Sequence, residues 1–293
     1  MSDIAEIKYQ VRFTGLDADN HRLEAYPAAN SIEGITWSLN LTIHYLMTGK
    51  LRTRGNLSSN FKLYTTPSKK GSYNHEILLE IIKDPITISI ISAYAVNTAT
   101  PHINNFIKYI FGRALGTVNE IPSGIKTIYK KLSKRQKTEI ELLIQNIEPA
   151  LTRGHSAVGI TADQIEIKTK RTSVARLDIE TKDYIEAKPS ENYSIIDTNI
   201  TAYNSLSANG RLYDPESGSI IPFSIEKGHH VGTRNAVAAS LKSYEDGNYG
   251  TIKITACPVE TNSGRLKKYL IRSAEEIHPS DWEDGKNPLT TKR

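Results

Sequence analysis

Hydrophobic and polar residues alternate along the first segment of the chain. Ile7, Tyr9, Val11 and Phe13 are separated by polar side chains, which is the period-two pattern of a strand with one buried face. Apolar residues then recur at intervals of three and four over residues 28–46, so they share one face of a helix. The chain is therefore predicted to begin with a strand and a long amphipathic helix.

Two shorter strands are expected after this helix. The helix should end at Gly49, because glycine readily adopts the left-handed conformation of a helix C-terminus. The strands cover 61–64 and 77–82, and a turn-rich segment at 67–72 joins them. A strand, a long helix and two further strands indicate an α+β arrangement in which the helix lies on a small sheet.

Residues 85–107 contain no Asp, Glu, Lys or Arg. A run of 23 such residues is long enough to cross a bilayer, but Asn97, Pro101 and His102 interrupt it with groups that are costly in hydrocarbon. We expect a buried or interface helix pair here, and a membrane-inserting element is the alternative.

A basic stretch follows, in which Glu120 and Glu139 are the only acids between positions 108 and 139. The next helix is amphipathic and is expected to end before Pro149. A helical hairpin with a basic outer face completes the predicted N-terminal domain, residues 1–155. That face comprises Lys126, Lys130, Lys131, Lys134, Arg135 and Lys137.

The remainder of the chain is predicted to be mostly β-structure. Residues 156–190 suit short strands or an extended linker, and residues 191–277 indicate a small five-stranded β-barrel with one helix between its third and fourth strands. Residues 278–293 are polar and are expected to be a disordered tail. The barrel strands are expected at 195–203, 210–213, 220–225, 251–257 and 265–271, and the helix at 235–243.

Composition adds little that is specific. The 37 Lys and Arg exceed the 32 Asp and Glu, giving a formal net charge of +5, which permits a polyanionic partner without requiring one. The single Cys257 excludes a disulfide framework and is expected to be a small core residue. No basic segment followed by an apolar one comes after Met1, so we predict no secretory signal and a cytoplasmic protein.

Enzyme signatures are missing from the sequence. It contains no Gly-x-Ser-x-Gly elbow, no phosphate-binding loop and no His-Glu-x-x-His helix, so catalysis is not indicated and no cofactor is expected. Asp17, Asp19 and His21 could hold a divalent cation, but such residues before a helix more often act as caps. His229 and His230 are interpreted as a surface pair, because no second ligand pair accompanies them.

Nucleic-acid binding has the better physical case. Small barrels offer a face on which bases stack on aromatic rings while basic groups meet phosphate. The alternative is that Tyr213 and Phe223 fill the barrel. The candidate binding residues are Tyr203, Arg211, Tyr213, Phe223, Arg265, Lys267 and Lys268.

Short motifs through both halves of the chain carry a resemblance. They are Asp19-x-His21-x-Leu23, Ala28-Ala29-x-Ser31-Ile32-x-Gly34-Ile35, His44-Tyr45-Leu46-x-Thr48-Gly49, Pro67 before Gly71-Ser72, Gly210-Arg211-x-Tyr213-Asp214 and Ile221-Pro222-Phe223. With these motifs the chain resembles an uncharacterised family of bacterial proteins. The resemblance implies an N-terminal α+β domain, a C-terminal five-stranded barrel and an association with conflict against phage or mobile elements, and it supplies no catalytic residues.

We hypothesise a non-catalytic binding or assembly protein whose barrel contacts nucleic acid. The N-terminal domain would form a homo-oligomer or engage a partner protein from a defence operon. One alternative is a membrane-acting abortive effector that uses residues 85–107, the only case in which a membrane is a partner. The other is a metal-dependent enzyme at Asp17, Asp19 and His21.

Overall fold

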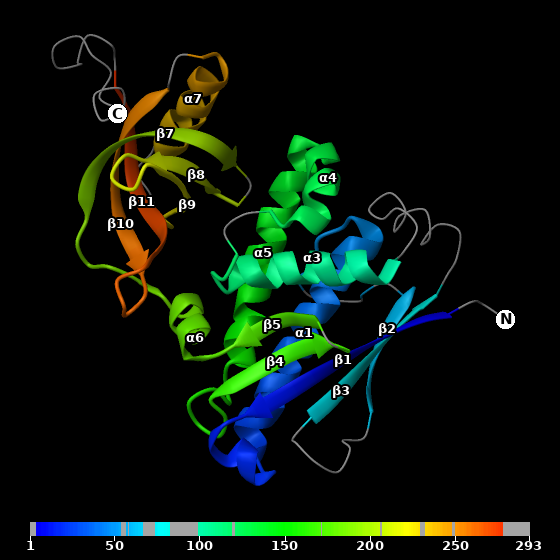
Figure 1. Ribbon diagram of the computed structural model, residues 1–293. Helices are drawn as coiled ribbons and strands as arrows, with labels where there is room; N and C mark the ends of the chain where they lie inside the picture. Colours follow the sequence, from blue (N-terminus) through cyan, green and yellow to red (C-terminus); the bar gives the residue numbers. More distant parts are fainter. Residues whose placement is uncertain are drawn as a thin grey trace. The chain divides into compact units, whose positions relative to one another are not determined.

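The computed structural model describes residues 4–53, 57, 59–66, 74–82, 99–118, 121–170, 172–205, 207–228, 232–247 and 250–277. The chain divides into two compact units, Met1–Ile185 and Glu186–Arg293, which are drawn in Figure 1. The first is an antiparallel sheet with helices and the second is a closed barrel, so the predicted α+β fold class is confirmed.

A five-stranded antiparallel sheet organises the first unit, in the order β2-β3-β1-β4-β5. Side chains alternate along β1 as the sequence predicts: Tyr9 and Val11 are fully buried, and Glu6 and Lys8 are exposed. The buried side therefore faces the helices and the polar side faces solvent. The strands are β1 (Ile4–Thr14), β2 (Phe61–Thr66), β3 (Asn74–Ile82), β4 (Gln164–Thr169) and β5 (Thr172–Leu177).

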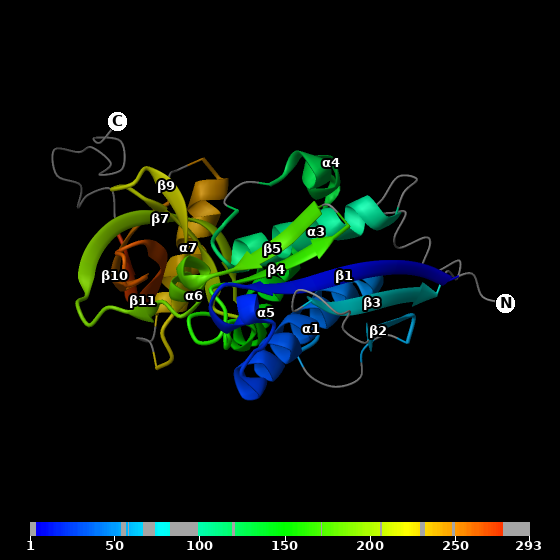
Figure 2. The same ribbon diagram turned by 60° about the horizontal axis from the view of Figure 1, so that its bottom comes forward.

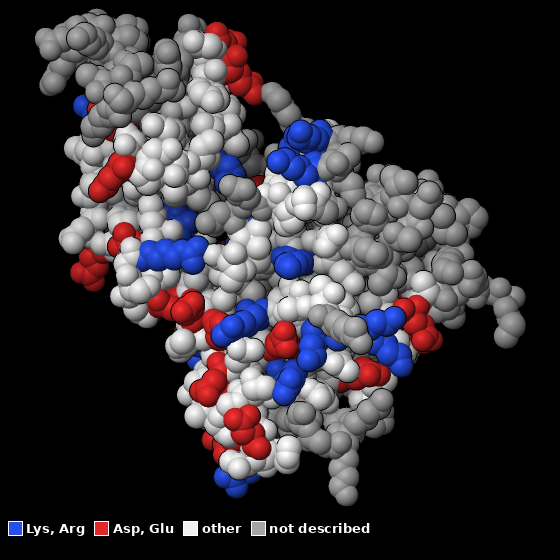
Figure 3. Space-filling view, viewed as in Figure 1, with Lys and Arg blue, Asp and Glu red and all other residues white. Residues whose placement is uncertain are grey.

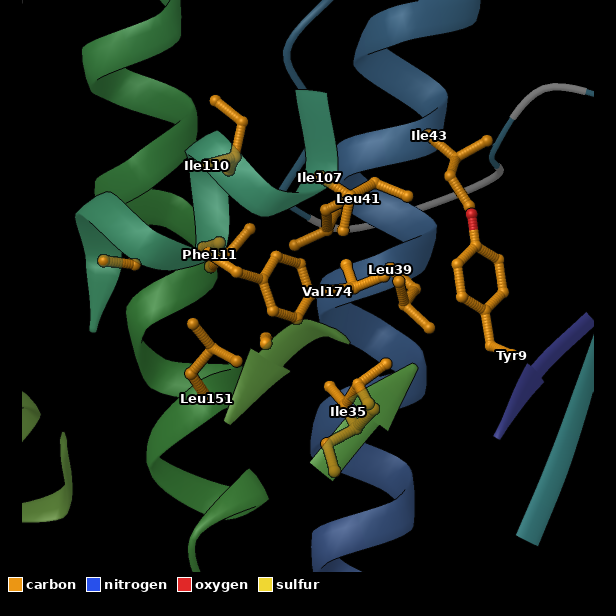
Figure 4. Packing of buried hydrophobic residues seen from close by; sticks show 14 of the residues in the cluster. Tyr9, Ile35, Leu39, Leu41, Ile43, Ile107, Ile110, Phe111, Leu151 and Val174 are labelled. Atoms are coloured by element: carbon orange, nitrogen blue, oxygen red, sulfur yellow. The ribbon is translucent and has the colours of Figure 1, made fainter. Parts of the chain in front are cut away.

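Helices supply the other half of this unit's core. The predicted apolar face of the long helix is buried, and Gly49 ends that helix with a φ of 63°. Figure 4 shows Ile35 and Leu39 of this helix in one cluster with Phe111 and Leu151 from two other helices. The helical elements are η1 (Leu16–Asn20), α1 (Ala25–Thr48), α3 (Ala99–Ala114), α4 (Ser123–Lys131), α5 (Lys134–Gly154) and α6 (Ile179–Ile185).

Helices α1 and α5 cross at very short range. A Cβ atom added to Gly34 would lie 2.3 Å from the carbonyl oxygen of Ala150 and 2.4 Å from the backbone nitrogen of Gly154. Ser31, one turn earlier on α1, accepts a hydrogen bond of 2.9 Å from the backbone N–H of Ala157. The small residues of α1 are therefore required by backbone contact, since any larger side chain would separate the helices.

Two expectations for this unit need correction. Of the two alternatives for residues 156–190, the structure has the short strands, β4 and β5, and the boundary expected at residue 155 moves to Ile185 because Ile165 and Ile167 on β4 are buried and pair with β1. Helix α5 does not end before Pro149 but continues to Gly154. Packing against α1 outweighs the hydrogen bond that proline cannot donate.

Five strands close the second unit into a barrel. Its spatial order is β11-β9-β8-β7-β10, and β10 pairs again with β11. All neighbouring strands are antiparallel except β9 and β11, and β7 curves around the barrel in Figures 1 and 2. The strands are β7 (Ser194–Asn204), β8 (Asn209–Asp214), β9 (Ser219–Ile225), β10 (Thr251–Glu260) and β11 (Leu266–Glu276), with the short β6 (Lys188–Pro189) pairing at the edge of β10.

One helix, α7 (Thr233–Glu245), lies between the third and fourth barrel strands in sequence. Its Val237 is fully buried in the barrel core, and its Ser240 hydroxyl accepts the N–H of Ile200 at 2.9 Å while donating to the carbonyl of Gly250. When β7 is counted as the first strand, β8, β9, β10 and β11 are the second to fifth strands. Around the barrel the neighbours then follow the order 1-2-3-5-4, and strand 4 pairs with strand 1. With a helix between the third and fourth strands, this is the arrangement of the OB fold.

Several predictions fall outside the described residues. They concern the tail 278–293, the pair His229 and His230, and residues 85–98 of the uncharged run. The rest of that run lies in α3, where Ile103 and Ile107 are buried in the first unit's core. Among the helices that the structure describes, none has the length and apolar character needed to cross a bilayer.

Candidate nucleic-acid interface

The register of β8 and β9 decides which side chains point out of the barrel. Leu212 is fully buried and pairs with Ile221, which packs against the barrel core. Side chains alternate between the two faces of a strand, so Arg211 and Tyr213, on either side of Leu212, point outward. Pro222, the partner of Arg211 on β9, points outward with them. Arg211 and Tyr213 are half-buried, and neighbouring outward positions on one strand place a cation beside an aromatic ring.

Tyr203 and Phe223 lie inside the barrel, which corrects the expectation that they offer stacking surfaces. Phe223 is 1% exposed, and its ring stacks on that of Tyr203 with centroids 6.2 Å apart and planes at 15°. Gly210 pairs with both residues, and a Cβ atom there would lie 2.5 Å from the Phe223 ring. The glycine leaves room for this aromatic pair, in which Phe223 is closed to a base and the half-buried Tyr203 ring is stacked against it.

The candidate basic residues of β11 have three different environments. Lys268 is half-buried and its ammonium donates a hydrogen bond of 3.2 Å to the hydroxyl of Ser224 on β9. Lys267 is only 8% exposed. Arg265 is exposed in the turn before β11, where its backbone N–H donates to the Thr261 hydroxyl at 2.9 Å. Lys268 therefore borders the outward face of β9, Arg265 lies exposed in the turn between β10 and β11, and Lys267 is buried.

A buried carboxylate fixes the turn beside Tyr213. Asp214 is 3% exposed and accepts hydrogen bonds from the backbone N–H of Ser217 at 3.0 Å and from the Tyr269 hydroxyl at 3.3 Å. Burial and the Asp214 charge both raise the pKa of Tyr269. The Thr198 hydroxyl donates to the Tyr213 carbonyl at 2.5 Å. The backbone of the candidate face is thus held from both sides, which favours a preformed site.

Sequence analysis missed a second polar cluster on the barrel. The Arg272 guanidinium lies 3.6 Å from the centroid of the Tyr193 ring, and Glu226 accepts hydrogen bonds from Arg272 at 3.0 Å and from the Tyr193 hydroxyl at 3.1 Å. The hydrogen bond from Arg272 lowers the pKa of Glu226. The three residues are far apart in sequence, so no local pattern predicts this contact, which joins the residue before β7 and the residue after β9 to β11.

Charge is divided unequally between the two units. Met1–Ile185 contains 24 Lys and Arg against 18 Asp and Glu, a net charge of +6, and Glu186–Arg293 contains 13 against 14, a net charge of −1. The barrel therefore has no general attraction for polyanions. Its outward positions on β8 and β9 carry Arg211 and no Asp or Glu, so no acidic side chain at these positions opposes a phosphate.

The predicted basic face lies on α4 and α5 of the first unit, where Figure 3 shows blue atoms gathered over α4. Lys126 and Lys130 are exposed on α4. Arg135 is exposed and forms an ion pair of 3.0 Å with Glu139. The Lys137 ammonium lies 5.6 Å from the centroid of the Tyr129 ring. The side chains of two further members, Lys131 and Lys134, are outside the described set.

The candidate metal residues have structural partners instead of facing one another. Asp19 accepts the backbone N–H of Gly15 at 2.9 Å, and Asp17 forms an ion pair of 3.2 Å with Arg22. His21 adopts a left-handed φ of 57° after η1. No group of three or more His, Cys, Asp or Glu suited to a metal occurs in the described part of the chain. Neither η1 nor α1 begins with a side-chain cap, so the expected capping role is not seen, and the two carboxylates instead bind the Gly15 backbone and the Arg22 side chain.

Fold and face together define a two-unit α+β protein with a C-terminal OB-type barrel. Residues 9–186 match a family described as a domain of unknown function, DUF7946, and residues 193–275 match a family of unknown function, DUF7947. The chain therefore belongs to the DUF7946 family, with a DUF7947 region over its barrel. No curated protein and no solved structure matches it. The two-part family resemblance is confirmed, and bacterial origin stays a prediction.

Proposed function

We propose that the protein is a non-catalytic binding protein whose barrel binds single-stranded nucleic acid across β8 and β9. The observation that carries the proposal is the outward placement of Tyr213 beside Arg211 on the second strand of an OB-type barrel. The outward side of the second and third strands is where OB folds bind oligonucleotides. A ring for a base and a cation for a phosphate are the two groups that such binding needs.

Recognition on this face would be independent of base sequence. Tyr213 offers a π-face to any base, while Arg211, Lys268 and Arg265 meet the backbone. Three phosphate contacts give a slope of about −2 for the logarithm of affinity against the logarithm of salt concentration, at roughly −0.7 per contact for a single strand. We therefore expect modest affinity that falls with salt but does not vanish, because stacking is not screened.

Titration of a fluorescent oligothymidylate by anisotropy tests the proposal. Tyr213→Ala should weaken binding by roughly fivefold to hundredfold, since stacking contributes about 1–3 kcal/mol per base, and Tyr213→Phe should retain most of the affinity. Arg211→Ala and Lys268→Ala should each make the salt slope shallower by about 0.7. Lys253→Ala, an exposed lysine on β10, is the matched control and should change little.

Two results would refute this function. One is a wild-type protein that does not bind the oligonucleotide at low salt. The other is a Tyr213→Ala variant that binds as tightly as the wild type. The homo-oligomer, the partner protein from a defence operon and the role against phage or mobile elements remain predictions beside this proposal.

A further inference from the structure

The junction of α4 and α5 concentrates positive charge more strongly than any sequence of similar length in the chain. Residues 121–138 contain six Lys and Arg and no Asp or Glu. Lys126 and Lys130 are four residues apart on α4, so they lie on one side of the helix. Lys137 belongs to α5 but reaches the ring of Tyr129 on α4, at 5.6 Å. The two helices therefore present their lysines together, and we call this surface the hairpin tip.

These charges work against the stability of α5. Lys134, Arg135 and Lys137 occupy the first turns of the helix, where the positive end of the helix dipole favours acidic side chains and disfavours basic ones. An uncharged capping box already satisfies this end: the Gln136 N–H donates to the Ser133 hydroxyl at 3.2 Å, and the Ser133 N–H donates to the Gln136 side chain at 3.0 Å. Arg135 is offset by its ion pair with Glu139 and Lys137 by its contact with the Tyr129 ring. These contacts do not account for the exposed Lys126 and Lys130 on the neighbouring helix.

The described residues on the apolar side of α4 pack against the core of the first unit. Ile125 is 4% exposed, and Tyr129 packs edge-on against Tyr109 with ring centroids 5.9 Å apart. Leu132, which follows α4, packs against the same core. A helix that binds a bilayer inserts its apolar side between lipids. In α4 the apolar residues Ile125 and Tyr129 instead contact the core of the first unit. The surface of this helix is suited to a charged polymer in water and not to a membrane.

From this geometry we propose that the hairpin tip binds the phosphate backbone of double-stranded nucleic acid, independently of the barrel. Duplex DNA carries about one negative charge per 1.7 Å of its axis, and lysines that neutralise it gain affinity by releasing counterions. The described tip presents Lys126, Lys130 and Lys137 to such a partner. The net charge of +6 on the first unit adds long-range attraction.

The triple variant Lys126→Ala, Lys130→Ala, Lys137→Gln of the full chain tests the inference with a 20-base-pair duplex. Its salt slope should be shallower by about 3, at roughly 0.9 per lost phosphate contact, and its affinity at 50 mM salt should fall at least tenfold. The matched control is Lys50→Ala, Lys62→Ala, Lys170→Ala, which removes the same charge from three exposed lysines of the same unit. The control should keep the slope and most of the affinity.

Three outcomes would overturn the inference: an unchanged slope in the triple variant, an equal loss in the control, or capture by phosphatidylserine vesicles in place of the duplex. Unfolding midpoints of both variants should match the wild type, and a second variant with Lys126→Ala and Lys130→Ala alone covers the case in which the change at Lys137 disturbs Tyr129. Failure here stays distinct from failure of the barrel proposal, because Tyr213→Ala is measured on single strands and leaves the hairpin tip intact.

Discussion

The two units of this protein carry charge in different ways. The first has a net charge of +6 and its densest run of Lys and Arg where α4 meets α5. The barrel has a net charge of −1 and keeps Arg211 next to an outward aromatic ring. The first unit offers charge alone, and the barrel offers charge beside an aromatic ring. Our proposals of a duplex ligand for the first unit and a single-stranded ligand for the barrel rest on this contrast.

The units also share a device, which is a glycine that allows backbone contact. In the first unit Gly34 brings α1 against α5, and in the barrel Gly210 lets Phe223 approach β7 and β8. In both places a Cβ atom would lie 2.3 Å from a carbonyl oxygen. Each core therefore depends on one position that admits no side chain, and the two positions can be tested as a pair.

The largest expected effect comes from filling these positions. Gly34→Ala should destabilise the first unit and Gly210→Ala the barrel, each by about 2–3 kcal/mol, because overpacking forces backbone shifts. Hydrogen exchange measured by mass spectrometry at increasing denaturant follows each unit separately. Gly218→Ala is the control, since its added Cβ meets nothing within 4 Å and only its left-handed conformation opposes the change. Loss of both units from either single substitution would contradict the division of the chain into two units.

A buried histidine should make the first unit the more acid-sensitive of the two. His155 donates from Nδ1 to the Leu151 carbonyl at 2.7 Å and accepts the Thr181 hydroxyl on Nε2 at 2.9 Å. Burial lowers its pKa to about 4, although the Leu151 carbonyl and Asp178 raise it and Lys182 lowers it further. Between pH 6.5 and 4 the unfolded chain therefore binds a proton on His155 and the folded chain does not. The free energy of unfolding thus decreases as the pH is lowered through this range.

The expected loss is about 2–3 kcal/mol between pH 7 and pH 4.5, at 1.36 kcal/mol for each unit of pKa difference. His155→Gln should flatten this dependence in urea unfolding of the first unit. Burial also lowers the pKa of His44 and His75, so some dependence should remain. The described part of the barrel contains no histidine, so the stability of the barrel should depend less on pH over this range. If the free energy of unfolding of His155→Gln depends on pH as steeply as that of the wild type, His155 is not the cause.

Much of the fold could be predicted from local pattern. The five barrel strands and α7 lie within a few residues of their expected bounds, because turn residues separate short alternating runs. The buried face of α1 follows from its spacing. Short strands were one of the two alternatives for residues 156–190, but their place in the first unit's sheet could not be predicted. The alternation of Ile165 and Ile167 does not show that the partner strand is β1.

The candidate site could be predicted only in part, for a similar reason. Arg211 and Tyr213 were identified from residue type alone, and β8 does place both on the outward side. Tyr203 and Phe223 were assigned to the same surface, but the register puts them inside, against Gly210. Which face an aromatic residue occupies depends on pairing, because a shift of one residue reverses every side chain.

The smallest expected effect concerns an exposed ion pair across α1 and α5. Arg153 contacts both carboxylate oxygens of Glu33, at 2.7 and 2.9 Å, and this hydrogen bonding lowers the pKa of Glu33. About half of each side chain is exposed, so solvent screens the attraction, and Glu33→Gln should cost about 0.5 kcal/mol. Urea unfolding of the first unit at low and high salt measures it. A loss of more than about 2 kcal/mol in the free energy of unfolding would mean that the Glu33–Arg153 ion pair, and not the close packing, stabilises the crossing of α1 and α5.

A parallel titration of a single strand and a duplex across salt concentrations tests the central contrast most directly. The wild type, Tyr213→Ala and the triple hairpin-tip variant are compared on both ligands. The account predicts that Tyr213→Ala weakens the single strand and spares the duplex, and that the triple variant does the reverse and flattens the duplex salt slope. Equal weakening of both ligands by either variant, or binding of neither ligand by the wild type, would contradict it.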